Sequence, residues 1–202
     1  MLKLSFWHFW YKYNFIYIYM INLNQSNMKI YTKKGDSGFT SLFDCTKISK
    51  SDDLIDLIGD LDELNSFIGV INNPQILPDI QIWIFDLSTI IANPKNKYSF
   101  DEDLTNIISM ENEIDKLTAL LPKLSNFILP SGNIHIARAI TRRCERKLVS
   151  IINKYTHIPN NCLIFLNRLS DYLFTLARFD NINNEVIYRK SSILSIIRTD
   201  SE

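Results

Sequence analysis

Apolar residues recur at spacings of three and four along most of the chain after residue 50, which is the pattern of amphipathic helices. The six prolines divide this part of the chain into segments, and proline is rarely tolerated inside a helix. We therefore expect five helices, at about residues 51–72, 80–92, 101–121, 133–153 and 160–179. Because no alternating strand pattern, repeat or long linker accompanies them, the sequence predicts an all-α, five-helix bundle.

Polar residues at the predicted helix starts support these bounds. Ser51 to Asp53 provide a cap residue and an acidic first turn, and Asp101 to Asp103 place acids where the third helix is expected to begin. The second segment is apolar on nearly every side, which fits a buried helix or a buried strand by periodicity alone. Its length favours a helix.

Residues 1–27 differ from the rest, and we exclude them from the fold. They hold nine of the 24 aromatic residues and no acid, since the first acidic residue is Asp36. The apolar run at residues 15–23 is far shorter than the roughly 20 residues that a spanning helix needs, so we expect no membrane anchor. An organelle-targeting leader, a peripheral aromatic tail and sequence upstream of a start at Met28 all stay open, the last being favoured. Residues 28–202 are expected to form one domain.

Charge and cysteine usage narrow the class of protein. The chain has 22 basic and 22 acidic residues, so it lacks the basic excess of a nucleic-acid-binding protein. Its three cysteines are far apart, which is typical of a reducing, intracellular compartment. We expect the cytoplasm, or the mitochondrial matrix if residues 1–27 are a transit peptide.

Two polar segments do not fit a plain bundle. Residues 30–43 hold two of the five glycines among Thr, Ser and Lys, whose N–H and O–H groups could hold a polyphosphate, although an ordinary polar loop is the commoner case. Arg138, Arg142 and Arg146 fall on one stripe of the fourth helix and repel one another unless anions neutralise them. A solvated face with Glu145 pairing locally is the alternative.

Other polar positions have two interpretations each. The acids Asp60, Asp62 and Glu63 of the first helix are exposed charges or partners that hold an arginine in position. Asn167 and Asp171 lie one turn apart on the fifth helix, as in an interhelical hydrogen bond or, less often, a ligand contact.

Metal and thiol chemistry have little support. The histidines at 8, 135 and 157 form no Glu-x-x-His motif and no zinc-like cluster, so we expect no metal site built by the protein. Cys45, Cys144 and Cys162 lack a nearby histidine in sequence and are expected to be buried structural thiols.

Five segments together resemble the PduO-type ATP:cob(I)alamin adenosyltransferases and occur in that family's order over about residues 28–190. They are IYTKKGDSGFTS (30–41), GDLDELNS (59–66), FILPSG (127–132), ARAITRRCER (137–146) and FLNRLSDYLFTLAR (165–178). The resemblance implies a homotrimer with an active site at each subunit interface. It also implies that the 5′-deoxyadenosyl group of ATP, bound with Mg²⁺, is transferred to cob(I)alamin, giving adenosylcobalamin and triphosphate.

The resemblance further implies roles for individual residues. Arg138 contacts ATP and is held by Asp62, Arg142 is the third residue expected in catalysis, and Phe127 closes the lower face of the corrin ring. The ATP site comprises Thr32, Lys33, Lys34, Gly35, Thr40, Ser41, Lys50, Arg142, Arg143, Glu145, Arg146 and Asn167. Cobalt(I) is itself the nucleophile, which explains why the sequence shows no catalytic serine, cysteine or general base.

Two other functions compete with this one. A non-catalytic cobalamin or nucleotide carrier on the same fold would bind ligands without turnover, and a purely structural bundle would do neither. As partners of the enzyme we expect ATP, corrinoids, a corrinoid reductase and an adenosylcobalamin-dependent enzyme, and neither nucleic acid nor a membrane.

Overall fold

The computed structural model describes residue 31, residues 33–95 and residues 99–189. The chain divides into two units, Met1–Phe39 and Thr40–Glu202, which we describe separately. Residues 1–27 and Thr32 lie outside the described residues, so the expected extension and the role of Thr32 remain predictions. Within the described residues, no helix is both long and apolar enough to cross a membrane.

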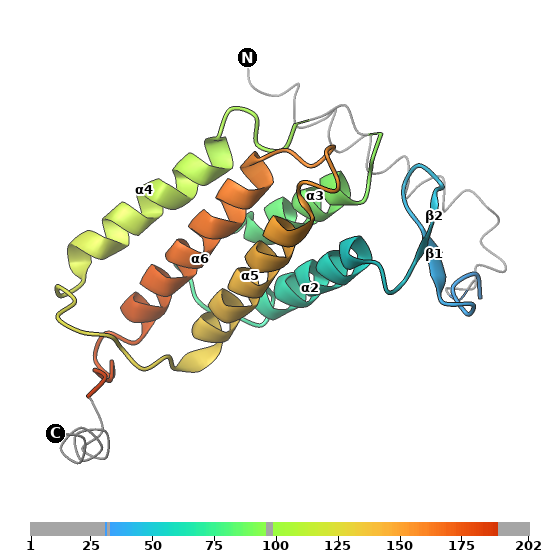
Figure 1. Ribbon diagram of the computed structural model, residues 1–202. Helices are drawn as coiled ribbons and strands as arrows, with labels where there is room; N and C mark the ends of the chain where they lie inside the picture. Colours follow the sequence, from blue (N-terminus) through green and yellow to red (C-terminus); the bar gives the residue numbers. More distant parts are fainter. Residues whose placement is uncertain (1–30, 32, 96–98, 190–202) are drawn as a thin grey trace, which may run out of the picture. The chain divides into compact units, whose positions relative to one another are not determined.

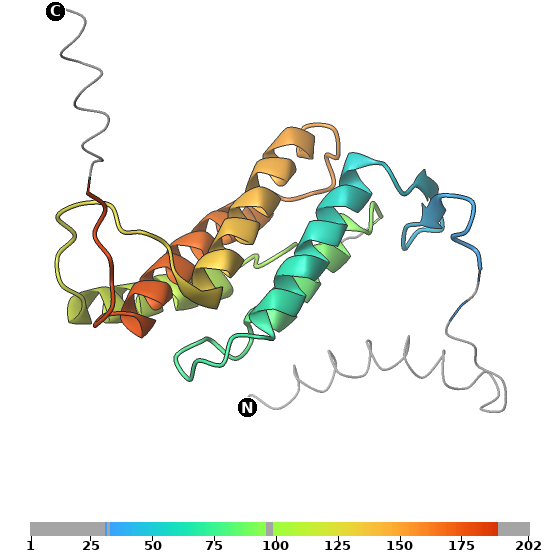
Figure 2. The ribbon, with the colours of Figure 1, turned by 90° about the horizontal axis from the view of Figure 1, so that it is seen from below.

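The second unit contains a bundle of helices, as the sequence predicted. The helices are α2 (Asp53–Ile68), α3 (Ile80–Ile91), α4 (Thr105–Leu120), α5 (Gly132–Ile151) and α6 (Asn161–Asp180). Helix α5 lies between α2 and α6 and packs on both, while α3 packs on α2 and α4 packs on α6 (Figures 1 and 2). The prediction of five helices is confirmed for the described part of the chain.

Apolar side chains at helical spacing form the core. In α2 the buried residues are Leu54, Leu57, Leu61, Leu64 and Ile68, which all face the neighbouring helices. Phe165 of α6 is fully buried and contacts the rings of Trp83 and Phe100 edge-on, with centroids 6.4 and 5.1 Å away. Helix α6 therefore links the α3 side of the bundle to the loop before α4.

Two helix bounds differ from the prediction. Helix α2 ends at Ile68 rather than near residue 72, because the next residues form tight turns that lead into Pro74. Helix α4 begins at Thr105 rather than at Asp101. The Asp101 carboxylate accepts hydrogen bonds from the amides of Asn106 (2.9 Å) and Ile107 (3.0 Å), so it caps the helix from outside.

A short β-hairpin precedes α2 and was not predicted. Strands β1 (Phe39–Ser41) and β2 (Lys47–Ser49) form a two-stranded sheet. Three residues per strand are too few for an alternating pattern to be recognised in the sequence. The amide of Phe43 donates to the carbonyl of Ala92 at 3.2 Å, which joins the hairpin to the end of α3.

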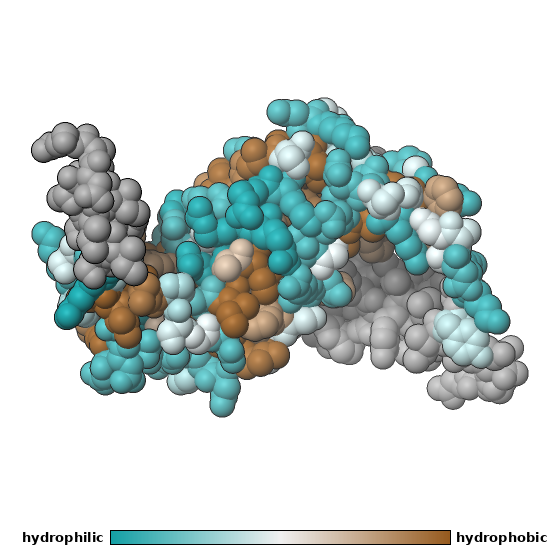
Figure 3. Space-filling view, turned by 60° about the horizontal axis from the view of Figure 1, so that its bottom comes forward, coloured by the Kyte–Doolittle hydropathy of each residue, from teal (hydrophilic) through white to brown (hydrophobic). Residues whose placement is uncertain are grey.

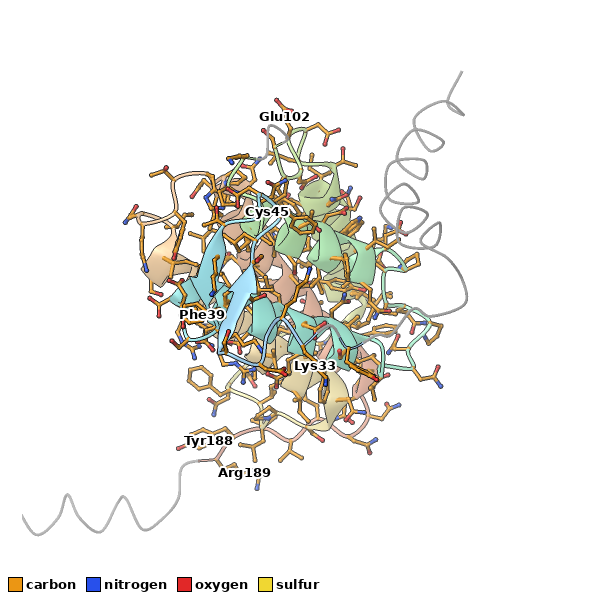
Figure 4. All side chains as sticks on the ribbon, turned by 90° about the vertical axis from the view of Figure 1, so that its right-hand side faces the viewer. Lys33, Phe39, Cys45, Glu102, Tyr188 and Arg189 are labelled. Atoms are coloured by element: carbon orange, nitrogen blue, oxygen red, sulfur yellow. The ribbon has the colours of Figure 1, made fainter. Side chains whose placement is uncertain are left out.

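The cysteine prediction is correct at two positions of three. Cys144 and Cys162 are buried, and burial raises the pKa of each thiol to about 12, which makes both unreactive. Cys45 is exposed in the hairpin turn instead of buried (Figure 4). Its φ of 68° belongs to the turn, whose short strands leave no core to cover it.

Tyr172→Phe is expected to destabilise the bundle by about 1–3 kcal/mol. The fully buried Tyr172 hydroxyl donates to the carbonyl of Gln75 (2.9 Å) and accepts from the amide of Leu77 (3.0 Å). Removing it leaves both backbone groups without this partner. Urea unfolding measures the change, and Tyr188→Phe, which deletes a hydroxyl from a partly exposed ring, is the control expected to change stability by less than about 0.5 kcal/mol. Equal effects in both variants would contradict the prediction.

Candidate active site

Helix α5 carries cationic side chains on two sides, and those on the side toward α2 are paired with acids of α2. Arg143 donates from Nε to Asp60 at 3.0 Å and also pairs with Glu63, and Lys147 Nζ lies 2.6 Å from Asp56 and 2.8 Å from Asp60. These contacts form a ladder of ion pairs between α5 and α2. Arg143, expected in the ATP site, is thus directed toward acids of its own chain.

Asp62 does not hold Arg138 within one chain. Asp62 is exposed, and among the described residues it has no ion pair with Arg138. Successive helical residues are about 100° apart, so Asp62 points about 200° away from Asp60, which faces α5. A single chain therefore does not form the pair of Asp62 and Arg138, which stays a prediction for an assembly of chains. Within one chain, Asp60 and Glu63 contact Arg143 of α5, and Asp60 also contacts Lys147.

Arg138 is half-buried and has no acidic partner among the described residues. Its Nε donates to His135 Nδ1 at 3.3 Å, and its guanidinium carbon lies 5.9 Å from the centre of the Phe174 ring. Burial lowers the pKa of the Arg138 guanidinium, and the positive charge of Arg142 lowers it further. A partly desolvated cation beside a second cation is suited to bind an anion.

The rest of this face continues the polar site. Arg142 and Arg146 are exposed, and Arg146 donates to the Arg142 carbonyl at 3.0 Å. Glu145, on the same face as Arg138 and Arg142, accepts a hydrogen bond from the side-chain Nδ2 of Asn167 on α6 at 3.0 Å. Of the helical part of the predicted site, Arg138, Arg142, Glu145, Arg146 and Asn167 thus lie on one surface of α5 and α6, whereas Arg143 does not.

The amino-terminal part of the predicted site lies apart from Arg138 within one chain. Thr40 and Ser41 are on β1, and Lys50 directly follows β2, three residues before the start of α2. That start lies at the carboxyl end of α5, because Tyr155 donates its hydroxyl hydrogen to Asp52 at 2.6 Å. Arg138 is near the other end of α5, about 20 Å from Ile151 along the helix axis at 1.5 Å per residue.

The first unit contributes a turn that contains three more predicted residues. The amide of Asp36 donates to the Lys33 carbonyl at 3.3 Å, and the amide of Gly38 donates to the Gly35 carbonyl at 3.2 Å. Gly38 has a φ of 80°, which requires a residue without a side chain to avoid strain. The side chains of Lys33 and Lys34 are exposed on this turn.

Among the described residues, Phe127 is the most exposed large apolar side chain, with 79% of its surface accessible, yet its backbone is held. The Phe127 carbonyl accepts from the Tyr188 amide (2.7 Å), and the Leu129 amide donates to the Val186 carbonyl (2.8 Å). We call residues 126–129 and 185–188 the Phe127 ribbon. The ribbon pairs a segment that precedes α5 in the sequence with a segment that follows α6. Arg189 comes directly after its second segment (Figure 4). Sequence reasoning missed this pairing because each segment is shorter than a recognisable strand.

His135 gives the Arg138 contact a pH dependence. Burial lowers the pKa of His135 and the Arg138 charge lowers it further, while Glu185 opposes both. The folded chain therefore favours the neutral ring. Below about pH 6.5 the unfolded chain takes up the proton first, so we expect the free energy of unfolding to decrease as pH falls, by at most about 1.4 kcal/mol per pH unit. Urea unfolding between pH 5 and 7.5 measures this slope. His135→Asn should reduce it, and an unchanged slope would contradict the prediction.

The described residues contain no group of three or more His, Cys, Asp or Glu side chains that could hold a metal ion. Glu145 and Asn167 still supply oxygen atoms beside the arginines, which is what Mg²⁺ needs when most of its ligands are phosphate and water. The donor set thus fits an ion that arrives with a nucleotide.

Comparison with known proteins identifies the family. The model of the cobalamin adenosyltransferase family matches residues 30–180. The chain is 38% identical to human corrinoid adenosyltransferase MMAB over 81% of this chain and 74% of that protein, and 37% identical to the Bacillus subtilis corrinoid adenosyltransferase over 87% and 100%. A phenylalanine-to-alanine variant of a Lactobacillus reuteri PduO-type ATP:corrinoid adenosyltransferase, complexed with cobalamin and ATP, superposes with a TM-score of 0.72 at 34% identity, covering 80% of this chain and all of that one. The five segments of the sequence resembled this family, and the comparisons confirm it: the chain belongs to the cobalamin adenosyltransferase family.

Proposed function

We propose that this protein is an ATP:corrinoid adenosyltransferase that transfers the 5′-deoxyadenosyl group of ATP to cob(I)alamin and releases triphosphate. The observation that carries the proposal is the face of α5 with Arg138, Arg142 and Arg146, where no acid of the described residues pairs with Arg138. The names of the relatives, corrinoid adenosyltransferases from bacteria to mammals, support the same activity.

The reaction requires the protein to align the two substrates and to stabilise the charge that develops on triphosphate. The electron pair of cobalt(I) forms a bond to C5′ of ATP while the C5′–O bond breaks, and that bonding pair leaves with triphosphate. Negative charge therefore grows on the leaving group, where fixed guanidinium groups stabilise it more in the transition state than in the ground state. Arg138 and Arg142 are placed for this role, and Mg²⁺, held by phosphates with Glu145 and Asn167 nearby, would neutralise further phosphate charge.

We propose that the active site is completed by a second subunit of a homotrimer. Lys50, Thr40 and Ser41 lie toward the end of α5 opposite Arg138, so one chain cannot place all of them on one triphosphate. Asp62 is exposed and could meet Arg138 of another copy. Apolar side chains also reach the surface of α3, among them Ile82 and Phe85, and the view from below shows apolar areas on the helical unit (Figure 3). Light scattering should give the mass of three chains.

On the corrinoid side, we propose that Phe127 packs against the lower face of the ring. An accessible aromatic ring on a held backbone can displace the axial ligand, which favours a four-coordinate cobalt that is easier to reduce. A separate corrinoid reductase would supply cob(I)alamin, and an adenosylcobalamin-dependent enzyme would use the product.

The test is anaerobic incubation of the purified protein with cob(I)alamin and Mg-ATP, followed by the visible spectrum of adenosylcobalamin. Product formation with equimolar triphosphate is expected. Binding of ATP or adenosylcobalamin without turnover would instead indicate a non-catalytic carrier, and neither binding nor turnover a structural bundle.

For the compartment, we propose the cytoplasm, which agrees with the free thiols of Cys144 and Cys162. The mitochondrial matrix is the alternative if residues 1–27 are a transit peptide, and the domain would then begin near Met28. Amino-terminal sequencing of the mature protein decides between these.

A further inference from the structure

A buried ion pair joins residue 185 of the Phe127 ribbon to the end of α6, and its arginine also binds the connection that leads to Phe127. Arg178, whose side chain is 7% exposed, donates from Nε to Glu185 Oε1 at 2.8 Å and from Nη2 to Glu185 Oε2 at 3.3 Å. The same Nη2 donates to the carbonyl of Pro122 at 3.0 Å. One guanidinium thus binds the start of the carboxyl-terminal segment and the start of the segment that leads to Phe127.

The ribbon has little else to hold it. Between the end of α4 and the start of α5, the described contacts that fix residues 126–129 are hydrogen bonds to residues 186–188, namely those of Asn126, Phe127 and Leu129. Most side chains of the ribbon are exposed, including Phe127, Leu129 and Val186, so burial contributes little to its order. A bidentate arginine–carboxylate pair is the strongest polar contact available, and its fixed geometry sets the register of the two segments.

The pair also lies near the cationic face. Glu185 acts through its negative charge on His135, where it opposes the lowering of the His135 pKa by burial and by Arg138. His135 in turn accepts the hydrogen bond of Arg138. Among the described residues Glu185 forms its ion pair with Arg178 and none with Arg138, so its influence on the cationic face is confined to the His135 ring.

We propose that Arg178 and Glu185 are positioning residues for the corrinoid half of the reaction: their ion pair holds the Phe127 ribbon in register and so places the Phe127 ring. This inference rests on the proposed function. It assigns the pair an effect on corrinoid binding and little effect on ATP binding, because the Phe127 segment carries none of the residues assigned to ATP.

The experiment compares Glu185→Gln with Glu111→Gln in the full-length protein. Glu111 also accepts from an α6 arginine, Arg168, at 2.8 Å, but away from the ribbon, so it is a matched control. For Glu185→Gln we expect the amides of Leu129 and Tyr188 to exchange with solvent at least about tenfold faster. We also expect the KM for cob(I)alamin to rise about tenfold while the KM for ATP stays within about twofold.

A double-mutant cycle tests whether the effect passes through Phe127. If it does, adding Glu185→Gln to Phe127→Ala should change the KM for cob(I)alamin little further, since the ring that the pair positions is gone. Tyr188→Pro, which removes the N–H donor to the Phe127 carbonyl but keeps the ion pair, should reproduce the corrinoid effect even if Glu185→Gln folds poorly.

Unchanged amide exchange in folded Glu185→Gln would overturn the inference, as would equal rises in both KM values or independent, multiplying effects in the cycle. Failure of the proposed function would look different. The unmodified protein would then form no adenosylcobalamin, while amide exchange would still report whether the pair orders the ribbon.

Discussion

Arg138→Ala is expected to lower kcat/KM for adenosylcobalamin formation by about 100- to 1000-fold. Removing one preorganised donor from a developing anion has effects of this size in other enzymes. Arg138 is partly desolvated, lies beside Arg142 and has no acidic partner in the described part of its chain, so we expect its charge to act on triphosphate. Anaerobic kinetics with both substrates varied measures the loss.

The matched control is Arg168→Ala on α6. It removes a guanidinium that is paired with Glu111 of α4 and Asp171 of α6. It should retain activity within a few-fold. Asp62→Asn should lower the rate less than Arg138→Ala, and little further in combination with it, if the two residues pair across subunits. Retention of more than half of the activity by Arg138→Ala would refute its role.

Phe127→Ala is expected to lower kcat by about 10- to 100-fold and to raise the KM for cob(I)alamin about tenfold, with little change in the KM for ATP. Burying a phenylalanine side chain stabilises a contact by about 1.5–3 kcal/mol, and in this site the contact would favour four-coordinate cobalt. The visible and paramagnetic resonance spectra of bound cob(II)alamin report this species directly. Its signal should decrease together with kcat.

Leu124→Ala is the control for Phe127→Ala, because Leu124 is an exposed apolar residue of the same connection. It should leave the four-coordinate signal unchanged. If Phe127→Ala lowered kcat but kept that signal, the residue would act by another route than ligand displacement.

Most of the bundle could be predicted because its signals are local. Prolines divide the helices, and the leucines of α2 repeat with the helical period. The start of α4 could not be predicted, since Asp101 is equally suited to the first turn of a helix and to a cap before it. The backbone decides between them, with a φ of 58° at Leu104.

Spacing in the sequence predicts which arginines of α5 share a face, but not which acids they pair with. The stripe of Arg138, Arg142 and Arg146 follows from spacing alone. Which acid meets which arginine depends on the rotation of α2 about its axis, so Asp60 and Glu63 reach Arg143 while Asp62 does not. The pair of Arg178 and Glu185 was missed because it becomes visible only when α6 and the ribbon are placed together.

Because α5 has two different sides, substitutions at the adjacent residues Arg142 and Arg143 should have different effects in a cell. Arg142 is exposed on the face proposed to bind ATP, whereas Arg143 belongs to the ladder with α2. Inherited or engineered changes at Arg143 should chiefly reduce the amount of folded protein in a cell, and additional cofactor should not restore what has been degraded. Changes at Arg142 should leave protein levels normal and slow the enzyme instead, so immunoblots would distinguish two adjacent arginine variants that an activity assay of a crude extract confuses.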